Sequence, residues 1–137
     1  MEEHNYICIG EIDFTENVFN EDEIGRTMFK DLGMCKILVY GGERTIEHFH
    51  IESPKGYSIC ICIYTAHYFA HGAHNDILNS SQKKQLNKWM SQENSKYLTT
   101  NWKAIESEWW RHNGNPKDRP KNPVQPDYSQ LQNYKTK

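Results

Sequence analysis

The chain lacks any long hydrophobic run. Its longest apolar run, Ile59 to Tyr64, has the length of a strand, whereas roughly 20 apolar residues are needed to cross a bilayer. The first residues, Met1 to Asn5, are acidic and lack the basic-then-apolar pattern of a signal peptide. These absences predict a cytoplasmic protein that does not contact a membrane.

The cysteines lack the spacing of common zinc or redox motifs. The four cysteines are Cys8, Cys35, Cys60 and Cys62, and none forms a Cys-x-x-Cys pair. Without an export signal, they are predicted to be reduced thiols rather than a disulfide framework. Cys60 and Cys62 are poor partners for each other, because residues two apart in a strand do not give easy disulfide geometry.

The usual catalytic motifs are also missing. No serine stands in a glycine-flanked elbow, and no cysteine lies in a motif that would lower its pKa. Gly41-Gly42 is predicted to be a hairpin turn, since no lysine follows it in the pattern of a phosphate-binding loop. The sequence therefore carries no enzyme signature, which favours a non-enzymatic protein.

Aromatic residues and an uneven distribution of charge are present instead. A length of 137 residues is typical of one domain, and aromatics make up 12% of them, enough to build a compact core. The net charge of −2 hides an asymmetry: residues 1–82 carry 13 acidic and 5 basic side chains, and residues 83–137 carry 5 acidic and 11 basic ones. These charges either neutralise each other within the fold and are solvated, or steer a charged partner.

The first half of the chain predicts strands. A short strand is expected at Tyr6–Ile9 and is predicted to end at Gly10, and a helix is expected from Asn20 to Gly33. Three further strands are predicted at 36–40, 46–51 and 57–64. Because isoleucines on one face of the last strand alternate with cysteines on the other, both faces should be covered, which predicts a central strand.

The second half predicts helices and then an arm. Asn79-Ser80-Ser81 and Thr99-Thr100 are expected to cap two helices, whose inward stripes are Leu86, Trp89 and Met90, and Trp102, Ile105 and Trp109. Residues 116–137 contain four of the five prolines and little periodicity. They are predicted to form an extended arm that is either mobile or strapped to the surface.

Together these patterns predict an α+β fold. We expect a small antiparallel sheet, made of a three-strand meander and a possible N-terminal strand, packed against two or three helices. Residues 1–115 would form a single domain, and residues 116–137 the proline-rich extended arm.

The order of motifs resembles a known family. His48-Phe49-His50 in a strand, an alternating strand, a helix carrying Leu86 and Trp89, and then Asn101-Trp102 resemble the small prokaryotic proteins grouped as domain of unknown function 4160. The resemblance covers about residues 35–112, although the family often has prolines where this chain has Thr45 to Glu47. It implies the fold and an interaction role, because genes of the family frequently lie in pairs that suggest toxin–antitoxin or defence systems.

Two histidines and two cysteines form the sharpest candidate site. His48 and His50 lie two apart in a predicted strand, so both side chains leave the same face and are within reach of one metal ion. Cys60 and Cys62 on the neighbouring strand could add soft ligands and complete the tetrahedral set that zinc prefers. The alternative is a structural role, in which the histidines bond to backbone or tyrosine groups.

A second candidate is the loop from His67 to His74. His67, His71 and His74 would share one helical face, but Gly72 argues against a regular helix, which favours contact with a partner over metal binding. Trp110, adjacent to a buried-stripe residue, points about 100° away. It is either an exposed contact for a partner or a residue covered by the arm.

The predicted function is therefore that of a protein-interaction module. Its partner would be another protein, in a toxin–antitoxin-like or phage defence or counter-defence pairing. One alternative is a metal-assisted hydrolase or nuclease using His48 and His50. Another is an auxiliary nucleic-acid binder using basic residues near aromatic ones, namely Lys83, Lys84, Lys88, Lys117, Arg119 and Lys121 with Tyr128 and Tyr134.

Overall fold

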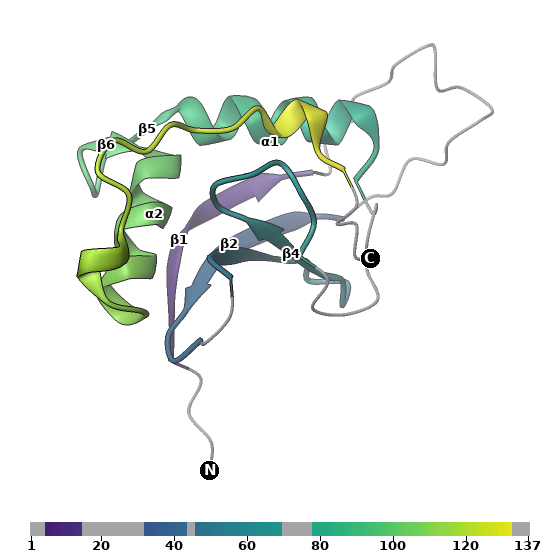
Figure 1. Cartoon of the computed structure of the whole chain (residues 1–137). Helices are drawn as coiled ribbons and strands as arrows, with labels where there is room; N and C mark the ends of the chain where they lie inside the picture. The colour runs from purple at the N-terminus through teal and green to yellow at the C-terminus, as the bar shows by residue number, and fades with distance from the viewer. Residues whose placement is uncertain (1–4, 15–31, 44–45, 70–77, 133–137) are drawn as a thin grey trace, which may run out of the picture.

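In the computed structural model, which describes residues 5–14, 32–43, 46–69 and 78–132, four strands form one antiparallel sheet (Figure 1). The strands are β1 Tyr6–Asp13, β2 Met34–Tyr40, β3 His48–Glu52 and β4 Ser58–Cys62. Their order, β1-β2-β3-β4, follows the chain, so each strand pairs with the next. The predicted α+β class, with a meander and an added N-terminal strand, is confirmed.

Two helices follow the sheet, as predicted. They are α1 Ser80–Ser91 and α2 Asn101–His112, joined through a small two-stranded sheet of β5 Glu93–Asn94 and β6 Thr99–Thr100. α1 begins with a capping box, because the Asn79 side chain accepts from the Gln82 N–H and the Gln82 side chain accepts from the Asn79 N–H. The Thr100 hydroxyl accepts from the Lys103 N–H and caps α2.

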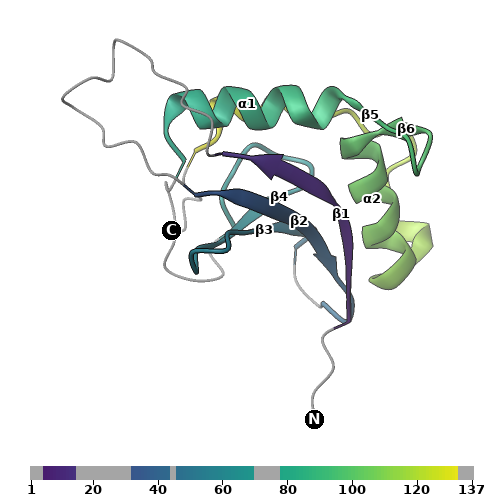
Figure 2. The ribbon, with the colours of Figure 1, turned by 180° about the vertical axis from the view of Figure 1, so that it is seen from behind.

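The hydrophobic core lies between the sheet and the helices. α1 runs across one face of the sheet, and α2 packs at its end beside β1 and β2 (Figures 1 and 2). Because successive strand residues point to opposite faces, one face of each strand joins this core. The sheet residues of this inner face include Ile37, Val39, Phe49, Ile51, Ile59 and Ile61, and the helix residues include Leu86, Met90, Trp102 and Trp109.

The strand predicted to be central, β4, lies at the edge of the sheet. Beyond it the chain folds back over residues 67–69, where the Cys62 N–H donates to the His67 carbonyl (2.9 Å) and the Phe69 N–H donates to the Cys60 carbonyl (2.8 Å). This return satisfies the backbone groups along the edge. β4 is therefore the outermost strand of the sheet, but its backbone is paired on both sides at these positions.

β1 continues past Gly10, where the sequence predicted its end. The register of β1 against β2 shifts between Cys8 and Gly10, and pairing then resumes as far as Asp13. A Cβ atom at Gly10 would lie only 3.0 Å from the Trp89 indole of α1. The glycine therefore accommodates a bulge and a closely packed ring rather than ending the strand.

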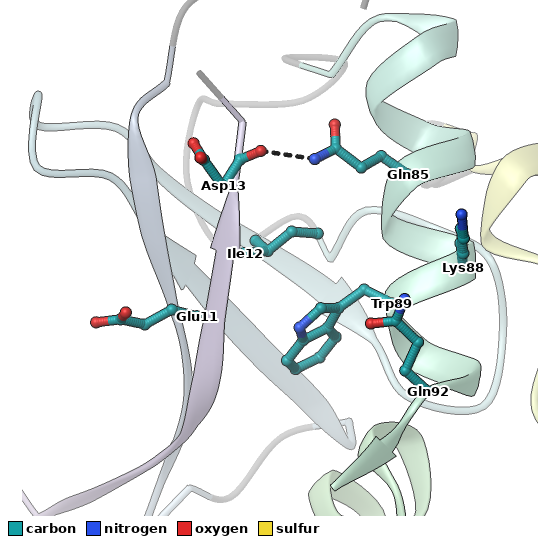
Figure 3. Close-up of a pocket in the computed structure, with 7 residues that line it drawn as sticks. All are labelled: Glu11, Ile12, Asp13, Gln85, Lys88, Trp89 and Gln92. Carbon is teal, nitrogen blue, oxygen red and sulfur yellow. Dashed lines mark hydrogen bonds between the residues drawn. The ribbon is translucent and has the colours of Figure 1, made fainter. Parts of the chain in front are cut away.

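A surface pocket lies between β1 and α1 (Figure 3). It is lined by Glu11, Ile12, Asp13, Gln85, Lys88, Trp89 and Gln92. The Gln85 amide donates to the Asp13 carbonyl (2.6 Å) and joins the helix to the strand at one end of the pocket. The lining combines acidic, basic and aromatic side chains, so it does not indicate one class of ligand.

The arm packs on the domain over residues 116–132. It contains two short 3-10 helices, η2 Pro116–Asp118 and η3 Tyr128–Gln130, and runs back along α1. Tyr128 is fully buried, and its hydroxyl donates to the Ile63 carbonyl at 2.7 Å. The Trp102 indole donates to the same carbonyl at 3.0 Å, so the arm, the sheet and α2 meet at one point.

Two further predictions, an early helix and the absence of a membrane span, can be compared only with the described residues. The helix predicted from Asn20 to Gly33 lies mostly outside them. Within the ranges given above, no helix combines the length and the apolar character that a bilayer crossing requires.

Candidate metal centre

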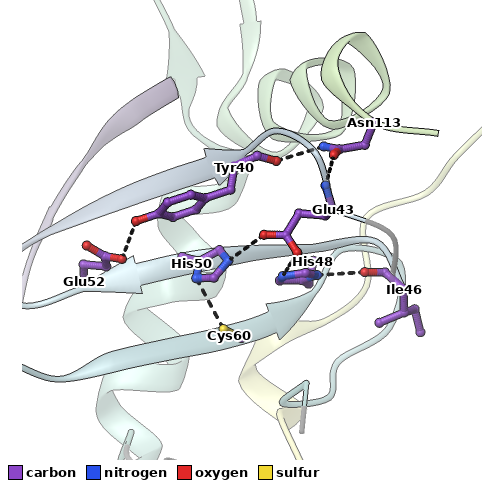
Figure 4. Close-up of polar contacts among 8 residues, drawn as sticks. All are labelled: Tyr40, Glu43, Ile46, His48, His50, Glu52, Cys60 and Asn113. Carbon is purple, nitrogen blue, oxygen red and sulfur yellow. Dashed lines mark hydrogen bonds and ion pairs between the residues drawn. The ribbon is translucent and has the colours of Figure 1, made fainter. Parts of the chain in front are cut away.

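The register of β3 and β4 brings the candidate ligands together. His50 pairs with Cys60 across the two strands, and His48 lies two residues earlier on β3, so all three share the face opposite α1. One ligand atom from each of His48, His50 and Cys60 lies within 4.8 Å of the others (Figure 4). Three of the four residues predicted for a metal site therefore converge in space.

His48 is held in one orientation within a buried environment. The Nδ1 atom donates to the Ile46 carbonyl at 2.7 Å, and because a carbonyl can only accept, this bond fixes the tautomer of the neutral ring. The ring is fully buried, with Phe69 stacked on it at 4.6 Å and Trp109 at 5.4 Å between ring centroids. A backbone carbonyl on one nitrogen is the usual way in which a metal-binding histidine is oriented, with the other nitrogen directed at the ion.

His50 contacts the thiol of Cys60 directly. Its Nδ1 atom lies 3.4 Å from Sγ, and the Tyr40 ring meets the imidazole edge-on at 4.5 Å. Burial raises the pKa of Cys60 to about 12, and the nearby carboxylates of Glu43 and Glu52 add to the increase. Without a cation, Cys60 is a protonated thiol that donates to His50.

Glu43 adds a carboxylate that the sequence did not predict. Its two oxygens each lie 3.8 Å from one imidazole Nε2, Oε1 from His48 and Oε2 from His50. The residue follows the Gly41-Gly42 turn, and its backbone N–H donates to Asn113 Oδ1 at 2.6 Å. This contact spans 70 positions of the chain, so no local signal in the sequence could have identified it.

Cys62, the fourth predicted ligand, lies outside the group. It pairs with His48 in the strand register, but only Cys60 joins the two histidines within the distance given above. Burial also raises the pKa of the Cys62 thiol, so it too is protonated at neutral pH.

Two of the four predicted partner-contact residues, His67 and Trp110, lie in the part of the chain that the structure describes. His67 is half-buried in the segment that covers the edge of β4, whereas His71 and His74 lie outside the described residues. Trp110 is buried, its indole donates to the Tyr64 hydroxyl at 2.7 Å, and its ring lies close enough to Gly114 to exclude a side chain there. Trp110 therefore fixes the end of α2 internally.

Part of the predicted nucleic-acid surface is used inside the fold. Arg119 makes two hydrogen bonds to the fully buried carboxylate of Glu106, at 3.0 Å from Nε and 2.6 Å from Nη2. Tyr128, one of the aromatic residues in that alternative, is buried in the core. Lys84, Lys88, Lys117 and Lys121 remain exposed.

The donor set indicates which ions would fit. Imidazole nitrogen suits zinc, copper, iron and nickel, and thiolate is a soft ligand that selects zinc, copper(I) and iron–sulfur clusters, whereas magnesium and calcium prefer oxygen alone. The mixed set of His48, His50, Cys60 and Glu43 therefore fits Zn²⁺.

Comparison with protein-family models, curated proteins and solved structures found no match to this chain. The resemblance to domain of unknown function 4160 accordingly stays a prediction, and the chemistry of the site rests on its own geometry.

Proposed function

We propose that this protein binds one divalent transition-metal ion, best matched by Zn²⁺, through His48, His50 and Cys60. The observation that carries the proposal is the convergence of three ligand atoms from two paired strands within 4.8 Å of one another. The fixed orientation of His48 supports it, because the bond to Ile46 directs the second ring nitrogen away from the backbone.

The ion has a structural role in this proposal. His48 is fully buried, and the aromatic rings of Phe69 and Trp109 cover it. A catalytic zinc site needs an open coordination position that substrate and water can reach, whereas a structural site is closed. Burial therefore favours a stabilising ion over a metal-assisted hydrolase or nuclease.

The buried thiols lack the activation that nucleophilic catalysis needs. Burial raises the pKa of Cys35 to about 11 and that of Cys60 to about 12, so neither thiol is an activated nucleophile at neutral pH. We propose a non-enzymatic interaction module, stabilised by its metal ion, that acts in a toxin–antitoxin-like or defence pairing. Co-purification of one specific protein from native expression would support this role, and isolation without any bound protein would count against it.

A zinc titration tests the metal site. Untagged, metal-free protein is titrated against a chromophoric chelator that competes for Zn²⁺, and one ion per chain is expected. Substitution of His48, His50 or Cys60 by alanine should weaken binding strongly, while His67→Ala, on the neighbouring segment, should not. Wild-type protein that takes up no Zn²⁺ in this titration would overturn the proposal.

A further inference from the structure

Glu43 and Asn113 extend the site beyond the two strands. We infer that Glu43 supplies the fourth ligand and that Asn113 positions it, so that the bound ion joins the sheet to the end of α2. This inference rests on the proposed metal site, and its own test uses different residues.

The carboxylate of Glu43 lies close to the spacing of a tetrahedral ligand set. In a zinc site with bonds of about 2.0–2.3 Å, neighbouring ligand atoms lie about 3.3–3.6 Å apart. The Glu43 oxygens lie 3.8 Å from Nε2 of His48 and from Nε2 of His50, a few tenths of an ångström beyond that spacing. The thiol of Cys60 meets His50 at the other ring nitrogen, Nδ1, at 3.4 Å. A shift of a few tenths of an ångström by the Glu43 side chain, which stands on a turn, would bring its oxygen into the coordination shell.

Charge gives an independent reason for a second anion. Two neutral imidazoles and one thiolate would leave a bound Zn²⁺ with a net charge of +1. The surroundings are largely buried, with His48 fully covered and the Glu43 side chain only 19% exposed, so an uncompensated charge there is costly. The carboxylate of Glu43 cancels that charge without any rearrangement of the strands.

Asn113 fixes the turn that carries Glu43. This residue follows the last turn of α2 and is buried. Its Oδ1 accepts from the Glu43 N–H at 2.6 Å, and its Nδ2 donates to the Tyr40 carbonyl at 2.9 Å, which holds both sides of the turn (Figure 4). Because Asn113 holds the turn against the end of α2, loss of its two hydrogen bonds should weaken metal binding, although Asn113 does not contact the ion.

The ligand role is tested by Glu43→Gln in the full chain. Glu52→Gln is the matched control, because Glu52 is a carboxylate on the same face that accepts from the Tyr40 hydroxyl instead. Glu43→Gln should weaken Zn²⁺ binding by at least about 10–100-fold, because loss of an outer-shell partner alone costs that much and a direct ligand contributes more. With Co²⁺ as the probe, Glu43→Gln should alter the ligand-field bands and keep the thiolate-to-cobalt absorption that depends on Cys60.

Asn113 is tested by a double-mutant cycle. Asn113→Ala should weaken Zn²⁺ binding in the wild-type background and have little further effect in the Glu43→Gln background. A general destabilisation of the fold would lower affinity in both backgrounds, so equal losses would overturn the positioning role.

The outcomes separate this inference from the proposed site. If Glu43→Gln binds Zn²⁺ as wild type does, or loses affinity with unchanged cobalt ligand-field bands, Glu43 is not a ligand and the inference fails. In that case His48→Ala and Cys60→Ala would still lose the ion, and the proposed function would stand. If wild-type protein binds no ion, both fail.

Discussion

Removal of the Tyr128 ring should unfold the arm and weaken the whole domain. The ring is fully buried and packs edge-on against Phe49 at 6.0 Å between centroids. Truncation of a buried aromatic side chain to alanine costs about 3–5 kcal/mol, through lost burial and the cavity that remains. Tyr128→Ala should therefore lower the free energy of unfolding by about 3–5 kcal/mol.

Tyr128→Phe separates the ring from its hydroxyl. The hydroxyl donates to the Ile63 carbonyl, but that carbonyl also accepts from the Trp102 indole, so it stays satisfied when the hydroxyl is removed. Loss of the hydroxyl should then cost about 1 kcal/mol, the net value of one ordinary hydrogen bond. Most of the effect of the alanine variant should come from the ring.

Urea unfolding followed by tryptophan fluorescence measures both variants. Val124→Ala is the control from the same arm, because its side chain is 79% exposed, and it should change stability by less than about 0.5 kcal/mol. If Tyr128→Ala cost no more than the control, the arm would not be part of the core in solution.

Three further perturbations probe other parts of the fold. Arg119→Met leaves the carboxylate of Glu106 buried with one partner fewer, so urea unfolding should show that the free energy of unfolding falls by about 3 kcal/mol. A fall of less than about 0.5 kcal/mol, which is typical of surface substitutions, would contradict the buried ion pair. Gly10→Ala brings a methyl group to 3.0 Å from Trp89, so the melting temperature should fall, and an unchanged value would argue against the close packing of that ring. In the folded, metal-free protein the pKa of Cys60 lies above its ordinary value of 9.0, so the folded state binds the thiol proton more tightly than the unfolded state does. The free energy of unfolding should therefore fall as the pH rises from 9 toward about 12. Thermal melts should show a weaker decline in Cys60→Ala, and an identical decline would assign the effect to other groups.

Much of the fold follows from local patterns in the sequence. The caps at Asn79 and Thr100 and the apolar spacing of both helices depend on neighbouring residues, and the structure has the helices where those signals lie. The pairing along the outer edge of β4 depends on the return of residues 67–69, which no residue within β4 encodes. The bulge at Gly10 likewise depends on Trp89, far along the chain.

The candidate site was likewise only partly predictable from the sequence. That His48 and His50 share a face follows from the two-residue period of a strand. The opposition of Cys60 to His50 depends on the register, which the turn after β3 sets through the hydrogen bond from the Ser53 N–H to the Tyr57 carbonyl. The carboxylate of Glu43 lay beyond sequence reasoning, because a residue at the far end of α2 positions it.

The exclusion of Cys62 was beyond the sequence for another reason. Cys60 and Cys62 have the same spacing from the strand's alternating isoleucines, and each faces a histidine across the sheet. Only the side-chain positions in the folded molecule distinguish them.

Native mass spectrometry of the untagged protein, purified metal-free and then supplied with Zn²⁺, is a direct test of the proposed zinc site. Each wild-type chain should retain one ion, and the triple variant His48→Ala/His50→Ala/Cys60→Ala, still folded by circular dichroism, should retain none. A folded wild-type chain that stays metal-free at a moderate excess of Zn²⁺, or a triple variant that holds the ion equally well, would contradict the proposed site.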